Sequence, residues 1–198
     1  MYNKGTLGVI QLFIMTELAT PACNFDEKAH DFSLKGTDGK TWALQDCAGP
    51  KGLLLMFICN HCPYVKVILD KLVVETDVLA MKGIGCVAIN PNDFISFPDD
   101  SYENMKIVSK KNGFGFPYLI DTDQEVAKKY NSVCTPDFFG YNADFKLQYR
   151  GRFDDRGSKN ISNPNQSDLF KAMFEIARTG KGPLKQESSI GCSIKWRK

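Results

Sequence analysis

An uninterrupted apolar segment, residues 53–58, is the most strongly patterned part of the chain, and a Cys-x-x-Cys motif follows it directly. A continuous apolar run of this length is typical of a strand buried on both faces of a sheet. Residues 64–82 then place their apolar side chains mostly at helical spacing. The pattern therefore predicts a buried strand, a turn that carries Cys59 and Cys62, and a helix.

The rest of the chain alternates in the same way between short apolar segments and amphipathic ones. Two spacings, Asp100 to Glu103 and Thr122 to Glu125, have the form of a capping box at a helix start. The expected strands and helices are, in order, residues 86–90, 100–112, 117–121, 122–131 and 169–179. Because strands that alternate with helices pair in parallel, we expect a parallel sheet covered by helices.

Two hairpins are expected to flank this alternating core. Within residues 24–50, two alternating segments meet at a tight turn, and we interpret them as a β-hairpin lid. Residues 138–150 carry a second hairpin, which adds antiparallel strands at one side of the sheet. The predicted fold class is therefore α/β, with a mixed central sheet flanked by helices.

The composition is that of an ordinary soluble domain, with 43% hydrophobic residues in a chain of 198 and a net charge of +2. Such a small charge gives no reason to expect a nucleic-acid partner, and no apolar run is long enough to span a membrane.

We divide the chain into an N-terminal extension or weak signal-like segment (1–22), one domain (23–180) and a C-terminal tail (181–198). Translation could start at Met1 or at Met15, and we expect a cytoplasmic protein unless residues 1–22 direct export.

The position of the Cys-x-x-Cys motif predicts redox chemistry. A helix N-terminus stabilises a thiolate, the form of cysteine that acts as a nucleophile. We expect Cys59 to be the exposed, low-pKa attacking thiol and Cys62 to be the buried resolving one, with Asn60 and His61 tuning the pair. Half a zinc site and two structural cysteines are the competing interpretations, but no second pair of ligands accompanies the motif.

Three features of residues 28–180 resemble the thioredoxin-like superfamily, and most closely its redoxin branch, which includes the AhpC/TSA and TlpA/ResA-like proteins. They are the strand, motif and helix around Cys59, the Thr135-Pro136 pair, and the extra strand and helix of residues 86–113. The sequence from Cys59 to Tyr64, CNHCPY, resembles the motif of a subgroup of uncharacterised redoxins. The resemblance implies a thioredoxin-like fold with an inserted β–α segment, a cis-proline at Pro136, and substrate binding by Thr135 and Pro136.

The chain departs from that family at two points. Gly52 and Met56 occupy the positions where peroxiredoxins resemble one another in carrying proline and threonine, and no arginine precedes Arg150. Residues 53–58 also lack the buried carboxylate typical of thioredoxins, so water, His61 or an acid elsewhere in the chain must manage the proton of the second thiol.

The other five cysteines are solitary. Cys134, directly before Thr135, could be a third redox thiol or a small packed residue. Cys192 could fold back from the tail to the motif or have no role. We interpret Cys23, Cys47 and Cys86 as structural.

The function we expect is thiol–disulfide exchange, in which Cys59 attacks a substrate disulfide and Cys62 resolves the mixed disulfide. The partners would be a disulfide-containing protein or a small-molecule thiol, and a reductant such as a thioredoxin system. No cofactor and no metal are needed. One alternative is a peroxiredoxin-like peroxidase with Cys59 as the peroxidatic thiol. Another is a copper-binding module like the Sco redoxins, using both motif cysteines and a histidine.

Overall fold

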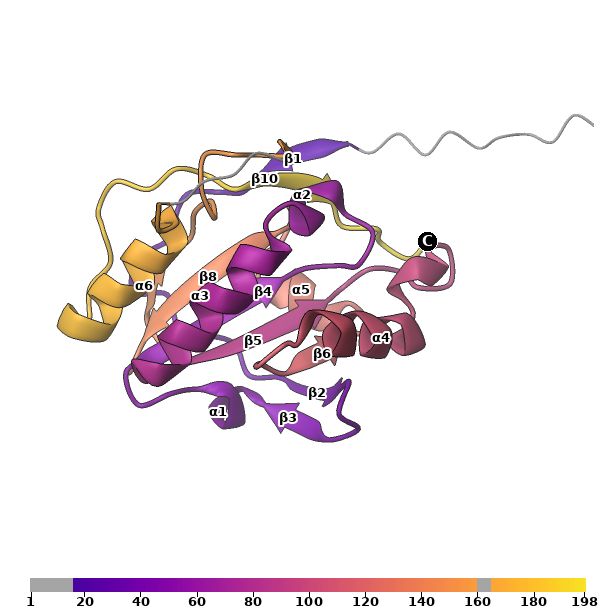
Figure 1. Cartoon of the computed structure of the whole chain (residues 1–198), viewed down its shortest axis with the longest axis horizontal. Coiled ribbons are helices and arrows are strands. Elements are labelled where there is room, and N and C mark those ends of the chain that lie inside the picture. The colour runs from indigo at the N-terminus through magenta and orange to yellow at the C-terminus, as the bar shows by residue number, and fades with distance from the viewer. Residues whose placement is uncertain (1–15, 160–164) are drawn as a thin grey trace, which may run out of the picture.

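The structure, a computed structural model, describes residues 16–159 and 165–198 (Figure 1). Within these residues, seven strands form one mixed sheet, in which β5 and β4 adjoin where the Ile58 N–H donates to the Ile89 carbonyl at 3.1 Å. In spatial order the strands are β3 (Thr41–Ala43), β2 (Ser33–Gly36), β6 (Tyr118–Ile120), β5 (Ile84–Asn90), β4 (Gly52–Phe57), β8 (Asp137–Asn142) and β9 (Leu147–Tyr149). The predicted α/β class with a mixed central sheet is confirmed.

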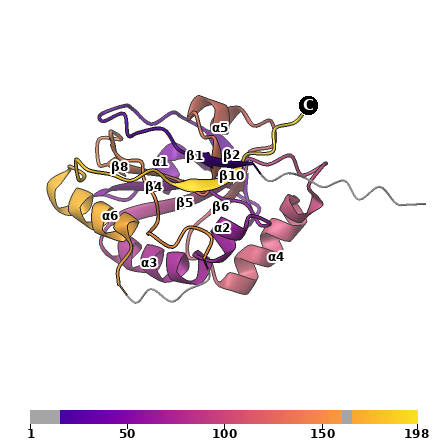
Figure 2. The ribbon, with the colours of Figure 1, turned by 90° about the horizontal axis from the view of Figure 1, so that it is seen from above.

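Helices cover both faces of this sheet. Seen from above, the sheet separates α3 (Leu69–Met81), α4 (Tyr102–Asn112) and α6 (Asp168–Thr179) from α1 (Leu44–Cys47) and α5 (Glu125–Lys129) (Figure 2). Successive side chains of β4 point to opposite faces and fill two separate hydrophobic cores, as the apolar pattern predicted. No helix among the described residues is long and apolar enough to cross a membrane.

The helix expected after the motif is broken in two. A single turn, α2 (Pro63–Lys66), is followed by Val67 and Ile68 and only then by α3. Three β-branched residues, Val65, Val67 and Ile68, crowd this turn, and such side chains lose rotamer freedom in a helix. Val65 and Ile68 are both buried in the same core on either side of the break.

Both predicted hairpins are present, but the first one is no lid. β2 pairs with β3 on one side and with β6 on the other, so this hairpin forms an edge of the central sheet. In the second hairpin, β8 lies antiparallel to β4 along its whole length and β9 pairs antiparallel with β8, so the hairpin adds antiparallel pairing at one side of the sheet, as expected.

A second, small sheet was not predicted, and it comes from three distant parts of the chain. Its order is β1 (Glu17–Ala19), β10 (Ile190–Ser193) and β7 (Cys134–Thr135), all antiparallel, and β1 and β10 run across the top of the molecule in Figure 1. β10 belongs to the segment expected to be a tail. Of the signal-like segment, residues 1–15 lie outside the described residues.

Candidate active site around Cys59 and Cys62

The two cysteines of the motif lie at the carboxyl end of β4, with Cys62 as the residue that caps α2. Pro63 occupies the first helical position, where its missing N–H costs nothing. Both thiols are buried, Cys59 with 2% and Cys62 with 0% of its surface exposed. The expectation of an exposed Cys59 is therefore wrong for this conformation, because β10 and the loop before α4 close over the motif.

The expected order of the two pKa values is also wrong. Burial raises the pKa of Cys59 well above its usual value, and the neighbouring Cys62 and Asp100 carboxylate raise it further. The pKa of Cys62 is instead lowered, because the neighbouring Cys192 and Cys59 thiols form hydrogen bonds with its sulfur. The one-turn α2 therefore does not offset the effect of burial on Cys59.

Thr135 contacts both motif thiols. The Thr135–Pro136 peptide bond is cis, as the family resemblance implied. The Thr135 hydroxyl lies 3.3 Å from the Cys59 sulfur, and its carbonyl lies 3.0 Å from the Cys62 sulfur, from which it accepts a hydrogen bond when that thiol is protonated. The structure thus brings together the four residues Cys59, Cys62, Thr135 and Pro136 that the sequence singled out.

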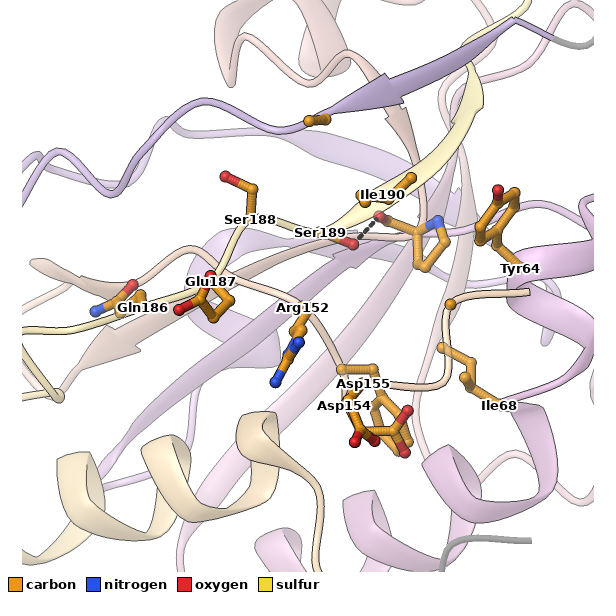
Figure 3. A pocket seen from close by; sticks show the side chains of 14 residues that line it. Tyr64, Ile68, Arg152, Asp154, Asp155, Gln186, Glu187, Ser188, Ser189 and Ile190 are labelled. Carbon is orange, nitrogen blue, oxygen red and sulfur yellow. Dashed lines mark hydrogen bonds between the residues drawn. The ribbon is translucent and has the colours of Figure 1, made fainter. Parts of the chain in front are cut away.

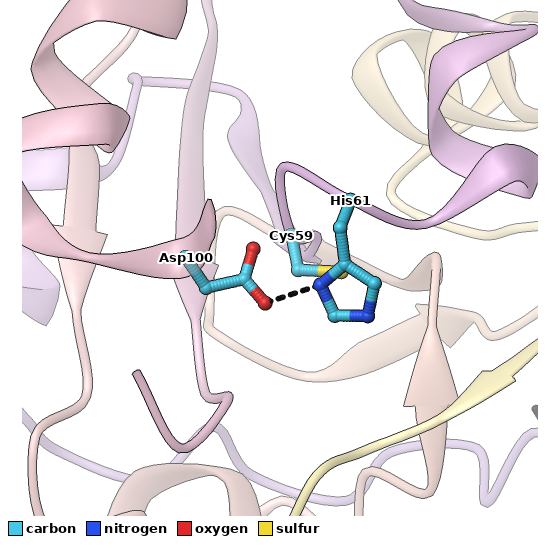
Figure 4. Close-up of side chains that lie close together, drawn as sticks. All are labelled: Cys59, His61 and Asp100. Carbon is cyan, nitrogen blue, oxygen red and sulfur yellow. Dashed lines mark hydrogen bonds and ion pairs between the residues drawn. The ribbon is translucent and has the colours of Figure 1, made fainter. Parts of the chain in front are cut away.

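A fifth residue of the site, Asp100, was missed by the sequence analysis. It belongs to the 3-10 turn η1 (Pro98–Asp100), its side chain is fully buried, and it points at the motif (Figure 4). One carboxylate oxygen accepts from the Asn60 backbone N–H at 2.7 Å. The other accepts from His61 Nδ1 at 2.6 Å and from the Asn92 side-chain amide at 2.8 Å. Asp100 therefore supplies the buried acid that β4 lacks.

The predicted capping box concealed this role. The N-cap of α4 is Ser101, whose hydroxyl accepts a hydrogen bond from the Asn104 N–H, so Asp100 is not the cap. Ser101 itself has the right chemistry for a cap, and this leaves Asp100 unexplained directly after a predicted strand and loop. An acidic residue without a capping role, close to the carboxyl end of a predicted parallel strand, was the signal in the sequence. Functional residues are often found at the carboxyl ends of parallel strands.

The predicted tuning residues are both held in place. The Asn60 side chain donates to the Asp99 carbonyl and accepts from the Tyr118 hydroxyl. The His61 ring stacks on Phe97 with 5.5 Å between centroids, and its Nδ1 lies 4.0 Å from the Cys59 sulfur. Because Nδ1 donates to Asp100, the other ring nitrogen of His61 remains for exchange with solvent or substrate.

Cys192 reaches the site from β10. Its sulfur lies 3.2 Å from that of Cys62, and its backbone is paired with Thr135. Of the two interpretations left open by the sequence, folding back to the motif is the one the structure shows.

Cys134 is buried beside the site and makes no hydrogen bond with either motif thiol in the described structure. Its sulfur is 3.8 Å from the Pro136 carbonyl, and burial raises its pKa. Burial likewise raises the pKa of Cys86 and Cys47 to about 12 and that of Cys23 to about 11. None of these four thiols shows the lowered pKa that marks Cys62.

One group of potential metal ligands occurs in the part of the chain that the structure describes: Cys59, His61 and Asp100, whose donor atoms lie within 4.8 Å of one another. The histidine nitrogen in this group is Nδ1, which already donates to Asp100. A metal ion would have to replace that hydrogen bond. The copper-binding alternative therefore competes with the contact that orients His61.

A cavity of about 400 Å³ lies beside Pro136, between the start of β10 and the α2–α3 region (Figure 3). Tyr64 and Ile68 line it from the α2–α3 region, and Arg152 and Ser189 line it from the later part of the chain. The Ser189 hydroxyl donates to the Pro136 carbonyl at 2.8 Å. The cavity therefore gives access to the cis-proline from a side that holds no cysteine.

Arg150, the first arginine of the chain, binds residues outside the motif. Arg150 donates to the buried Asp137 carboxylate at 3.0 Å and to the Asn131 carbonyl at 2.7 Å, and its guanidinium packs on Phe139. It therefore holds β9 to β8 and makes no contact with the motif in the described structure.

The comparisons with known proteins agree with this geometry. The model of the AhpC/TSA family matches residues 25–153, about two thirds of the chain. The chain belongs to the AhpC/TSA family. A search of curated proteins finds no match.

Solved structures extend the family assignment to the fold. An uncharacterised conserved protein from Geobacillus kaustophilus is 40% identical, with a TM-score of 0.87 over 92% of this chain and 97% of that one. A hypothetical protein from Sinorhizobium meliloti 1021 is 36% identical, with a TM-score of 0.86 over 90% and 98%. The thioredoxin domain of a thiol-disulfide oxidoreductase from Bacteroides vulgatus is 16% identical, with a TM-score of 0.55 over 66% and 89%. This AhpC/TSA chain therefore has the thioredoxin-like fold.

Proposed function

We propose that this AhpC/TSA protein is a thiol–disulfide oxidoreductase that works through Cys59 and Cys62. The observation that carries the proposal is the shared contact of both sulfurs with Thr135 beside the cis-proline, at 3.3 and 3.0 Å. Such a pair of thiols can convert to a disulfide while the backbone around them stays in place.

The chemistry follows from the positions of the protons. Cys59 attacks a substrate disulfide and forms a mixed disulfide, and its proton leaves on the departing substrate sulfur as the first substrate thiol. Cys62, whose pKa is lowered, then attacks the Cys59 sulfur as a thiolate, which frees the second substrate thiolate and leaves a Cys59–Cys62 disulfide. A dithiol reductant, such as a thioredoxin system, restores the two thiols.

His61 and Asp100 assist the leaving group. The side chain of His61 is 16% exposed, so it borders the path to Cys59, and Asp100 fixes the orientation of its ring. The second ring nitrogen of His61, which Asp100 does not bind, relays a proton to the departing substrate sulfur. Asn60 holds the loop against Asp99 and Tyr118 while this happens.

Substrate docking is proposed at Pro136 and the cavity beside it. The backbone edge of Thr135, where the resemblance implies that a substrate strand would pair, is already paired with Cys192 in β10. A substrate therefore does not pair along Thr135. Its disulfide reaches Cys59 past His61, and the cavity beside Pro136, which no cysteine lines, seats a neighbouring part of a disulfide-containing peptide.

The test is the exchange rate of the reduced protein with a small aromatic disulfide that releases a coloured thiol. Cys59→Ser is expected to slow release about a hundredfold or more, because the attacking sulfur is gone. Cys62→Ser is expected to accumulate the mixed disulfide on Cys59, visible as an added mass. Cys86→Ser, which changes a buried thiol on β5, serves as the matched control. Unchanged release by Cys59→Ser, or wild-type exchange no faster than a free thiol, would rule the proposal out.

The Thr135 hydroxyl favours a second candidate, a thiol peroxidase with Cys59 as the peroxidatic residue. It supplies, from the cis-proline loop, a hydroxyl at 3.3 Å from the Cys59 sulfur in place of the threonine missing from β4. Oxidation of the reduced protein by hydrogen peroxide distinguishes the two functions. A rate far above that of a free thiolate supports the peroxidase, and a rate equal to it supports exchange with disulfides.

A further inference from the structure

Three thiols, not two, meet in this site. Cys62 lies between Cys59, with which it exchanges a hydrogen bond, and Cys192, whose sulfur is 3.2 Å from its own. Cys192 is buried, as are the other two. A sulfur at this distance needs only a small approach to reach the length of a disulfide bond.

The fold fixes Cys192 there by backbone contacts on both sides. Cys192 pairs with Thr135 of β7 and with Glu17 of β1, so β10 is the middle strand of its sheet. Next to it, Gly191 lies so close to β7 that a Cβ atom on it would be 2.1 Å from the Thr135 carbonyl oxygen. Only glycine permits this approach, and the approach sets the distance between the two sulfurs.

The end of β10 is anchored beyond Cys192 as well. Ile194 is buried in the core that α5 covers, and the Lys195 carbonyl accepts from the Asp93 N–H at 2.8 Å. Lys195 N–H in turn donates to the side chain of Asn92, the same residue whose amide binds Asp100. The position of Cys192 is therefore tied to the loop that orients His61.

We propose that Cys192 is a third redox thiol, which takes over the disulfide from Cys59 and leaves it as a Cys62–Cys192 bridge. The inference rests on the proposed function, because exchange at Cys59 supplies the Cys59–Cys62 disulfide. Cys192 attacks the Cys62 sulfur, the Cys59–Cys62 bond breaks, and the Cys62–Cys192 bond forms. The proton of Cys192 passes to Cys59, so the step is an isomerisation that needs no further oxidant or reductant.

The step has two consequences for the site. Cys59 returns to the thiol form while the chain keeps its disulfide, so it can attack a second substrate or reverse the isomerisation. β10 becomes covalently joined to the residue that caps α2, which fastens the strand across Thr135. The bridge is buried and hence shielded from external reductants, which reach it only through Cys59.

Peptide mapping of the oxidised full-length chain tests the inference. The reduced protein receives one equivalent of a small-molecule disulfide, is quenched in acid, alkylated at its free thiols and analysed by mass spectrometry. We expect a peptide pair linked through Cys62 and Cys192, and an alkylated Cys59. In Cys192→Ser, which keeps a hydrogen-bond donor to Cys62, we expect Cys59 alkylation to fall about tenfold, because the Cys59–Cys62 disulfide has no other thiol to pass to.

Cys134→Ser is the matched control, because Cys134 is equally buried, neighbours Thr135 and lacks contact with Cys62. It should leave the linkage pattern unchanged, and near-UV circular dichroism should show both variants folded. If the wild type yields only the Cys59–Cys62 disulfide, the inference is overturned while the proposed function stands. If no disulfide forms and the aromatic disulfide is not reduced, the proposed function fails and the inference fails with it.

Discussion

Replacing Asp100 by alanine is expected to cost about 3 kcal/mol of folding free energy and to slow disulfide exchange about tenfold or more. The carboxylate accepts from the Asn60 backbone, from His61 and from Asn92, and all three donors lose their partner at once. His61, whose side chain is 16% exposed, regains a hydrogen bond to water, so the cost is less than the sum of three separate losses. Denaturant unfolding measures the first effect and release of the coloured thiol measures the second.

Two further substitutions separate the effect of Asp100 on stability from its effect on disulfide exchange. Ser101→Ala removes the cap of α4 and should cost about 1 kcal/mol with no change in exchange, because its hydroxyl bonds only within the helix start. Asp100→Asn keeps an acceptor for the Asn60 N–H but loses the charge opposite His61, so exchange should slow while the fold largely survives. If Asp100→Ala behaves like Ser101→Ala in both assays, Asp100 has no role in the site.

The second large effect is expected from Gly191→Ala. The new Cβ would overlap the Thr135 carbonyl, so β10 must move away from β7. We expect this to lower the free energy of unfolding by about 1–3 kcal/mol, as is typical when an extra methyl group is inserted into a well-packed protein interior. The movement separates Cys192 from Cys62 and removes a donor from the Cys62 sulfur. We therefore expect a lower melting temperature, a rise in the pKa of Cys62 and loss of the Cys62–Cys192 linkage.

Ile190→Ala is the control for this variant. Ile190 precedes Gly191 in β10, but 45% of its side chain is exposed, so its truncation should change stability by no more than about 0.5 kcal/mol. The pKa of Cys62 is followed by the absorbance of its thiolate during acid titration. Equal behaviour of the two variants would show that the close approach of Gly191 does not set the position of Cys192.

The parts of the fold that the sequence predicts are those governed by local pattern. β4 was predictable because both of its faces are buried, which leaves six apolar residues in a row. α6 was predictable because its apolar residues keep helical spacing and Ser167 caps it. The Cys-x-x-Cys motif lies where that strand ends, so its place at the edge of the sheet followed directly.

What the sequence did not predict depends on contacts between distant residues. Asp100 meets His61 across 39 positions, and although Ser101 beside it leaves Asp100 without a capping role, nothing local shows which residue it contacts. β10 is only four residues long, and pairing with β7 and β1 makes it a strand. A segment this short carries too little apolar pattern to predict a strand. The pKa order of Cys59 and Cys62 failed for the same reason, because burial and the Cys192 thiol decide it.

The separation of Cys62 from Cys192 by 130 positions has a consequence for biosynthesis. A ribosome makes the chain from its N-terminus, so Cys59 and Cys62 emerge long before the strand that closes over them. Until β10 arrives, Thr135 has an open edge and the two thiols have no cover. A newly made chain is therefore most open to unwanted disulfides with other proteins in the interval before its last residues leave the ribosome.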